Sequence, residues 1–222
     1  MSKPTLPCAA GPATHYELFA GLRDSGVAYL ATGATALVLH GVPRLTPDID
    51  LAVDAGPSNL ERLRRLLAAW GYGEPASRDT ADPDVAVRRF RHPSSALGAI
   101  DVIRVSPEAF TRLRDGAVVA TLVDVGIPVV GAADLLALKE GSRVGTDRED
   151  ADALRVLASI QSGEGGSDTD TRREQIRKFS RWSVAARLDW LLAAARLARG
   201  MSPEARPMTR GLVRRRGWYG GR

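Results

Sequence analysis

The pattern of apolar and polar residues along the chain predicts helices and strands in alternating order. Helices are expected where apolar residues recur every three or four positions, as Leu60, Leu63 and Leu67 do. Strands are expected at short apolar or alternating runs. The predicted helices span 15–25, 35–40, 59–70, 107–113, 132–140 and 148–160, and the predicted strands span 27–31, 49–53, 85–91, 99–105 and two runs within 118–130, separated by a turn at Gly126. This order favours an α/β or α+β fold, with helices packed on a sheet.

The C-terminal part differs from the rest of the chain. Residues 162–170 (S-G-E-G-G-S-D-T-D) are rich in Gly and Ser and predict a linker. The prediction is therefore a domain over 1–161, followed by a basic helical extension and flexible tail over 171–222. A long helical pattern runs from 171 to about 199, and its apolar stripe needs a partner surface in this chain or in another. The residues of that stripe are Val184, Leu188, Leu191, Leu192 and Ala195.

Composition excludes several classes of protein. The chain has 222 residues, and 44% of them are hydrophobic, which is enough to bury a sizeable core. A single cysteine, Cys8, and three histidines exclude an intramolecular disulfide and a Cys/His zinc framework. No apolar stretch approaches the roughly 20 residues of a membrane span, and the N-terminus lacks the basic-then-apolar order of a secretory signal. We therefore expect a soluble cytoplasmic protein with no membrane partner.

The net charge of +5 is unevenly distributed along the chain. Residues 172–222 contain 14 basic and 3 acidic residues, whereas the preceding part has a net charge of −6. Such asymmetry indicates contact with nucleic acid or another polyanion. The alternative is an arginine-rich end that is simply solvated.

The strongest candidates for chemistry are three aspartates in predicted strands. Asp48 and Asp50 bracket Ile49 at the start of a strand, so both carboxylates point to one face while Ile49 enters the core. Two carboxylates on one face repel each other unless a cation lies between them, and Mg²⁺ prefers oxygen ligands together with substrate phosphates. Asp101 is flanked by Ile100 and Val102 in a strand with no structural use for a charge. If the two strands are neighbours, the three carboxylates converge at one end of the sheet.

A glycine lies upstream of these aspartates, between a predicted strand and a predicted helix. At Gly33-Ala34 the backbone can approach a ligand closely, and the free N–H groups at the start of the helix favour a phosphate. Phosphates at the helix start and metal ions on the carboxylates together indicate phosphoryl or nucleotidyl transfer.

The spacing of these residues resembles a known signature. Gly33-Ala34, a gap of 13 residues and then Asp48-Ile49-Asp50 resemble the signature of the DNA polymerase beta-like nucleotidyltransferase superfamily. That signature is a Gly followed by Gly or Ser, a gap of about this length and an acidic-apolar-acidic triplet. Ala34 departs from it, because the usual residue at that position is Gly or Ser, and it lacks a hydroxyl that could contact a phosphate.

The local sequence resembles one branch of that superfamily most closely. Residues 40–53 (H-G-V-P-R-L-T-P-D-I-D-L-A-V) look like the minimal and AbiEii-type (type IV toxin) nucleotidyltransferases, in which an Arg-x-Thr precedes the aspartates, as Arg44 and Thr46 do here. Residues 134–150 also resemble a second motif of these proteins, which contains Lys139, Arg143, Asp147 and Asp150. Asp147 and Asp150 fall where helix N-caps belong, so capping is the simpler interpretation of at least one of them.

The resemblance implies a palm-like mixed sheet that binds an NTP, such as ATP, with two Mg²⁺ ions, for which Mn²⁺ could substitute. Asp48 and Asp50 would ligate metal, and Asp101 would bind the catalytic metal and help to deprotonate the attacking hydroxyl. Arg44 and Lys139 would offset the charge of the triphosphate, although Lys139 could equally be a solvated lysine at the end of a helix. The implied nucleotide-binding residues are Gly33, Ala34, Arg44, Thr46 and Lys139.

The favoured interpretation is transfer of a nucleoside monophosphate from an NTP to a hydroxyl acceptor. The basic C-terminus favours RNA, for example a tRNA end, as that acceptor. A role as the toxin of a toxin–antitoxin pair, with an antitoxin as partner, follows from the resemblance alone. One alternative is a catalytically silent domain of this fold that acts as an antitoxin or binding module. Another is a nucleic-acid-binding protein that acts through its basic C-terminus.

Overall fold

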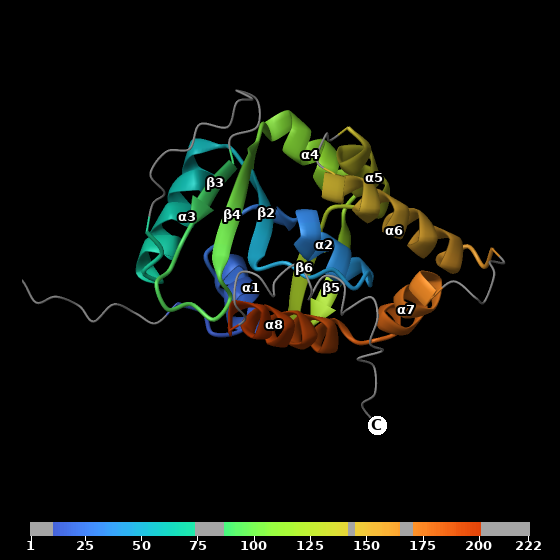
Figure 1. Ribbon diagram of the computed structural model, residues 1–222. Coiled ribbons are helices and arrows are strands. Elements are labelled where there is room, and N and C mark those ends of the chain that lie inside the picture. Colours follow the sequence, from blue (N-terminus) through green and yellow to red (C-terminus); the bar gives the residue numbers. More distant parts are fainter. Residues whose placement is uncertain (1–10, 74–86, 142–144, 165–170, 201–222) are drawn as a thin grey trace, which may run out of the picture.

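A mixed six-stranded sheet forms the centre of the computed structural model, which describes residues 11–73, 87–141, 145–164 and 171–200 (Figure 1). The strand order is β3-β4-β2-β1-β6-β5. Strand β2 runs parallel to β4 and β1 runs parallel to β6, whereas the other neighbours are antiparallel. The strands are β1 (Tyr29–Ala31), β2 (Asp48–Asp54), β3 (Val87–Phe90), β4 (Ala99–Val105), β5 (Val118–Leu122) and β6 (Val125–Val129).

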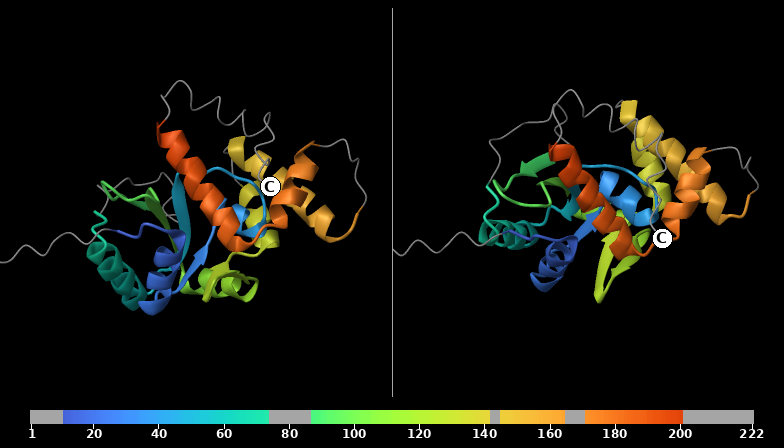
Figure 2. Two further views of the ribbon diagram at one scale, coloured as in Figure 1. Left: turned by 90° about the horizontal axis from the view of Figure 1, so that it is seen from below. Right: turned by 60° about the horizontal axis from the view of Figure 1, so that its bottom comes forward.

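Helices cover both faces of this sheet. Figure 2 shows α1 and α3 on one face, and α2 and α8 on the other. The helices are α1 (His15–Asp24), α2 (Gly33–His40), α3 (Pro57–Ala69), α4 (Pro107–Asp115), α5 (Ala132–Glu140), α6 (Gly145–Gln161), α7 (Thr171–Ser180) and α8 (Val184–Gly200). The predicted class of fold, a mixed sheet flanked by helices, is confirmed. Among the described helices, none is both long enough and apolar enough to span a membrane.

Strand β2 illustrates how the sequence pattern builds the core. Its side chains alternate between the two faces of the sheet, and Ile49, Leu51 and Val53 are buried in the hydrophobic core. The intervening positions place Asp48 and Asp50 on the opposite face. The same alternation therefore creates both the core and a row of carboxylates.

The C-terminal helices pack on the rest of the chain. The predicted long helix over 171–199 is two helices, α7 and α8, and Ser183 begins the second because its hydroxyl accepts a hydrogen bond from the Ala186 N–H (3.2 Å). The apolar stripe of α8 joins the main core and contacts α2 and β5, so the partner surface lies within this chain. Residues 165–170 of the predicted linker and the predicted flexible tail over 201–222 lie outside the described residues.

A half-buried arginine holds this arrangement together. The Arg187 guanidinium donates hydrogen bonds to the carbonyl oxygens of Leu39 (2.6 Å), at the end of α2, and Ser180 (2.9 Å), at the end of α7. Gly41 allows the close approach, since it has a φ of 103° and a Cβ there would lie 2.8 Å from Ser180. The corner between α7 and α8 is therefore docked against the end of α2.

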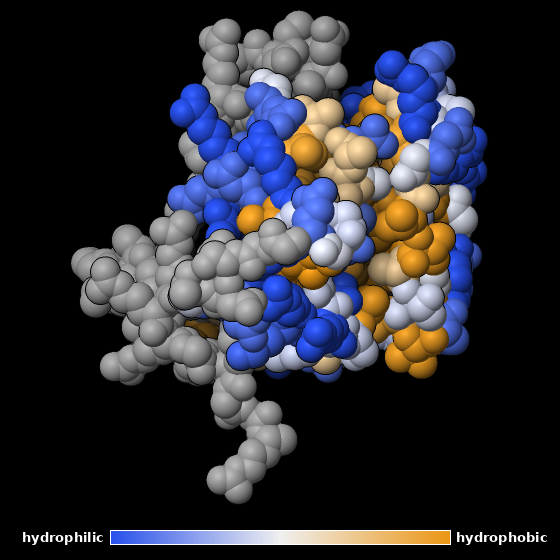
Figure 3. All heavy atoms as spheres, turned by 90° about the vertical axis from the view of Figure 1, so that its right-hand side faces the viewer, coloured by the Kyte–Doolittle hydropathy of each residue, from blue (hydrophilic) through white to orange (hydrophobic). Residues whose placement is uncertain are grey.

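The β5–β6 hairpin differs from the prediction at its turn. The chain reverses at Val123 and Asp124, whereas Gly126 lies within β6 opposite Thr121. Val123 adopts a positive φ of 58° and its side chain is exposed. Val118 and Val119 on β5 are also exposed. On the side of the molecule seen in Figure 3, apolar side chains (orange) reach the surface beside polar ones (blue).

Candidate active site

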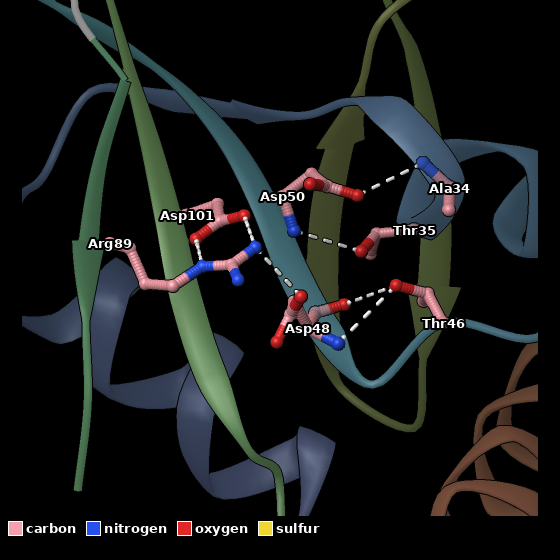
Figure 4. A network of polar contacts seen from close by, with 7 residues as sticks. All are labelled: Ala34, Thr35, Thr46, Asp48, Asp50, Arg89 and Asp101. Atoms are coloured by element: carbon pink, nitrogen blue, oxygen red, sulfur yellow. Dashed lines mark hydrogen bonds and ion pairs between the residues drawn. The ribbon is translucent and has the colours of Figure 1, made fainter. Parts of the chain in front are cut away.

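Three carboxylates lie together on one face of the sheet, contributed by two neighbouring strands. Strands β2 and β4 pair in parallel with Asp50 directly opposite Asp101, and paired residues of parallel strands point to the same face. Asp48 precedes Asp50 by two residues and so shares that face (Figure 4). The pairing that the sequence interpretation required, β2 beside the strand of Asp101, is present in the structure.

Helix α2 begins directly against Asp50. The Asp50 carboxylate accepts a hydrogen bond from the backbone N–H of Ala34 (3.0 Å) (Figure 4). The backbone N–H of Asp50 donates to the buried Thr35 hydroxyl (3.0 Å). Gly33 has a φ of 54°, and a Cβ at this position would lie 2.6 Å from the nearer carboxylate oxygen. Glycine is thus required both for the backbone conformation and for the contact between helix and carboxylate.

Thr46 fixes the start of β2. Its hydroxyl donates a hydrogen bond to the Asp48 carbonyl oxygen (3.0 Å) and accepts one from the Asp48 N–H (3.3 Å). The side chain is buried at 8% relative exposure. In the structure Thr46, which the resemblance implied as a nucleotide-binding residue, supports the backbone of Asp48.

Arg89 is the residue of this site that sequence reasoning missed. It lies on β3 opposite Asp101, and its guanidinium donates to both oxygens of that carboxylate (2.7 and 2.5 Å). The same group donates to Asp48 (2.9 Å) (Figure 4). A bidentate arginine–carboxylate pair is among the stronger polar contacts in proteins. The predicted strand over 85–91 was the available signal, but its register against the next strand, which brings Arg89 to Asp101, is not readable from local pattern.

The electrostatics of the site follow from burial and from its crowding of like charges. Burial raises the pKa of Asp50 to about 6, with the negative charge of Asp101 as the next contribution. Burial also raises the pKa of Asp48, against the opposing effect of the Arg89 charge. The hydrogen bonds to Asp101 in turn raise the pKa of Arg89. The carboxylates therefore outnumber the cation that touches them, and the site favours additional positive charge.

The donor chemistry of these residues suits a hard divalent cation, because all three side chains offer carboxylate oxygens. As the side chains stand, the described part of the chain contains no group of three His, Cys, Asp or Glu residues arranged to hold a metal ion. Two of the three carboxylates, those of Asp48 and Asp101, are paired with the Arg89 guanidinium in this arrangement.

A second ion-pair cluster joins α5, α6 and the segment before β2. The Lys139 ammonium lies 3.0 Å from Asp150 and also pairs with Asp147, and Arg44 lies 2.8 Å from Asp150. Burial alone would lower the pKa of Lys139, but its hydrogen bonds to Asp147 and Asp150 outweigh that effect and leave the pKa raised. The described contacts thus engage both Lys139 and Arg44 with Asp150.

The position at which α6 begins corrects one prediction. Asp147 and Asp150 do not lie at the N-cap of a helix, because α6 begins at Gly145 and both residues fall inside it. Asp150 is 4% exposed, and two cations compensate its buried charge. Arg143 of the same segment lies outside the described residues.

No protein-family model matches the chain, and a search of curated proteins finds no match. Among solved structures, the chain is similar to the lincosamide antibiotic adenylyltransferase LnuA in its lincomycin-bound form, with 19% identity and a TM-score of 0.49 over 64% of this chain and 94% of that chain.

Two other solved structures show a similar degree of likeness. ANT(2")-Ia in complex with adenylyl-2"-tobramycin is 14% identical, with a TM-score of 0.45 over 73% of this chain and 94% of that chain. An antigenic nucleotidyltransferase-like protein from Paracoccidioides brasiliensis is 16% identical, with a TM-score of 0.41 over 72% of this chain and 82% of that chain. A likeness of this size leaves the function to the residues of the site itself.

Proposed function

We propose that this protein transfers a nucleoside monophosphate from an NTP to a hydroxyl acceptor in a reaction that depends on Mg²⁺. The observation that supports the proposal is the convergence of Asp48, Asp50 and Asp101 on one sheet face, directly beside the start of α2. Three carboxylates this close repel one another unless cations balance them, and the single Arg89 guanidinium pairs with only two of them. Together the carboxylates and the start of α2 suit a substrate that carries phosphates and bound divalent cations.

Each residue has a distinct part in the proposed reaction. Asp48 and Asp50 would hold the divalent cations, which neutralise phosphate charge and lower the pKa of a bound hydroxyl. Asp101 would share that task and accept the proton of the acceptor. The acceptor oxygen forms a bond to the α-phosphorus, the bond from that phosphorus to the β-phosphate oxygen breaks, and pyrophosphate leaves. Gly33 lets the start of α2 approach Asp50, so that helix and carboxylates face the same substrate.

RNA is the acceptor that the distribution of charge favours. Residues 172–222 contain 14 basic and 3 acidic residues, and phosphate contacts dominate the affinity of proteins for nucleic acids. In the described part of this region the basic residues differ in their contacts, and Arg177 and Lys178 pair with Glu174. Arg173 and Arg187 turn inward to carbonyl and hydroxyl oxygens, whereas Arg181 and Arg196 are exposed and are the candidates for phosphate contact.

A transfer assay tests the proposal. Wild-type protein is incubated with Mg²⁺, total RNA and each of the four α-labelled NTPs in turn, beside Asp48→Asn. Asp54→Asn is the matched control, since Asp54 ends the same strand and accepts a hydrogen bond from the Gly56 N–H (2.9 Å). We expect labelled RNA and released pyrophosphate with wild type and Asp54→Asn, and a loss of about a hundredfold or more with Asp48→Asn. Equal transfer by wild type and Asp48→Asn would refute the proposal, as would no transfer by wild type with any NTP.

One observation favours a second candidate, a catalytically silent module of the same fold. Arg89 binds two of the three carboxylates, and a permanent ion pair there would exclude a metal ion. A silent module requires that Mg²⁺ and NTP leave this ion pair intact. The same transfer assay separates the two candidates, because the silent module would show no release of pyrophosphate.

A further inference from the structure

Arg89 supplies positive charge to the candidate site in this structure. Its guanidinium is held by both oxygens of Asp101 and by one oxygen of Asp48. These are two of the three carboxylates to which the proposed function assigns metal ions. A bound cation and the guanidinium therefore compete for the same oxygen atoms.

The position of Arg89 allows its side chain to leave without disturbing the core. Strand β3 forms one edge of the sheet, and the Arg89 side chain is 43% exposed, against 12% for Asp101 and 20% for Asp48. Backbone pairing with β4 holds the Cα of Arg89 opposite Asp101 in either case. A rotation of the side chain toward solvent thus moves the charge but keeps it at the mouth of the site.

The chemistry of the side chain gives it a second partner. A guanidinium is always charged at physiological pH, and its planar fork binds phosphate oxygens in the same bidentate way as carboxylate oxygens. Arg91 lies two residues further along the chain, and its positive charge acts on Asp48. An Arg89 side chain released from the carboxylates would lie close to this second cation, and together they would face an anionic ligand.

We propose that Arg89 exchanges partners during binding: it holds Asp48 and Asp101 while no divalent cation is present, and it moves to the phosphates of the nucleotide when a cation takes its place. This inference rests on the proposed function. It makes Arg89 a substrate-binding residue that also keeps the carboxylates paired before the cation binds.

The exchange has two consequences of opposite sign. Removing the guanidinium by Arg89→Gln frees the carboxylates, so Mn²⁺ alone should bind about three- to tenfold more tightly. The same change removes a phosphate contact, so an NTP analogue in the presence of saturating Mn²⁺ should bind about three- to tenfold more weakly. If Arg89 had a purely structural role, Arg89→Gln would bind both Mn²⁺ and the NTP analogue more weakly, or both as wild type does.

The experiment measures binding and needs no turnover. Free Mn²⁺ is followed by electron paramagnetic resonance, and binding of an ATP analogue with a methylene bridge between the α- and β-phosphorus is followed by calorimetry. Arg88→Gln is the matched control, because Arg88 is the exposed neighbour on β3 whose side chain points to the other face. Arg89→Lys is a second variant, which keeps a positive charge at this position, and it should bind Mn²⁺ about as wild type does. Wild-type affinity in Arg89→Lys would show that a substitution at residue 89 does not by itself unfold the site.

The outcomes separate this inference from the proposed function. Tighter Mn²⁺ binding and weaker analogue binding by Arg89→Gln alone support the exchange. If wild type, Arg89→Gln and Arg88→Gln bind Mn²⁺ equally, or if Arg89→Gln loses both ligands, the exchange is refuted while the metal site stands. If wild type and all variants fail to bind Mn²⁺ at millimolar concentration, both the exchange and the proposed function are wrong.

Discussion

The substitution Gly33→Ala, which adds one methyl group, tests the contact between the start of α2 and Asp50 directly. The φ of 54° at Gly33 lies in the region that favours glycine, and a Cβ would lie 2.6, 2.7 and 2.9 Å from Oδ2, Cγ and Cβ of Asp50. The last of these atoms is fixed by the β2 backbone, so rotation of the Asp50 side chain alone cannot relieve the contact. The substitution Gly33→Ala should therefore push α2 and β2 apart.

The magnitude follows from two separable costs. An L-residue in the left-handed region costs about 1–2 kcal/mol, and overpacking adds about 1–3 kcal/mol. Gly163 isolates the first cost, because it has a φ of 74° and a Cβ there would meet no atom within 4 Å. We expect Gly163→Ala to lose about 1–2 kcal/mol of unfolding free energy and Gly33→Ala about 2–5 kcal/mol.

Urea denaturation, followed by the fluorescence of the chain's four tryptophans, gives both values from the midpoint and the slope. Gly33→Ala should also lose nucleotidyl transfer, because the Asp50 carboxylate no longer meets the Ala34 N–H, whereas Gly163→Ala should retain it. A stability loss in Gly33→Ala no larger than that in Gly163→Ala would refute the contact between Gly33 and Asp50.

Three further outcomes concern stability. Burial raises the pKa of Asp50 to about 6, so the folded state binds the proton more tightly than the unfolded chain and loses stability as the pH rises from about 4 to about 6. In buffer with a chelator, Asp50→Asn should therefore be more stable than wild type by about 1–3 kcal/mol near pH 7, with no gain near pH 4, and thermal unfolding at both pH values checks this. Burial lowers the pKa of His15 to about 4, so its effect on stability depends on pH in the opposite direction. Its contribution of up to about 3 kcal/mol to the free energy of unfolding is present above about pH 6.5 and is lost as the pH falls toward 4. His15→Gln should flatten that part of the stability profile, and a profile as steep as that of wild type would contradict the assignment. Arg187→Ala leaves the carbonyls at the ends of α2 and α7 without their charged donor and should cost about 2–4 kcal/mol, against less than about 0.5 kcal/mol for the exposed Arg196→Ala; equal urea midpoints for the two variants would show that Arg187 does not fasten the C-terminal helices.

Local sequence pattern predicted the elements of this fold well, because burial with a period of two or of 3.6 residues is a local property. It also placed Asp48 and Asp50 on one face of a strand, since alternation alone determines that. The break between α7 and α8 was missed because the apolar stripe begins only at Val184, after the break, and gave no sign of where the helix starts. The contacts that hold this corner, from Arg187 to the Leu39 carbonyl oxygen and from Gly41 to Ser180, join residues far apart in the sequence. The turn at Val123 was missed because Gly126 was the more obvious turn residue.

The candidate site shows the limit of local reasoning more clearly. Asp101 could be singled out because a charge in an apolar strand is unusual, but its place opposite Asp50 depends on the parallel pairing of β2 and β4. Arg89 gave no such signal, since an arginine in an edge strand is ordinary and its role depends on the register of β3. Asp150 looked like a helix cap because its two partners, Arg44 and Lys139, are brought to it only by tertiary packing.

The position of a divalent cation in a crystal is the most direct test of the account. Crystals grown with Mn²⁺ and a non-hydrolysable NTP analogue should give anomalous scattering peaks within coordination distance of the Asp48, Asp50 and Asp101 carboxylates, with the triphosphate beside the start of α2. Arg89 should then be found away from Asp48 and Asp101. Mn²⁺ bound at another place, or carboxylates still held by Arg89 with the nucleotide bound elsewhere, would contradict the central claim that these three aspartates form a nucleotidyl-transfer site.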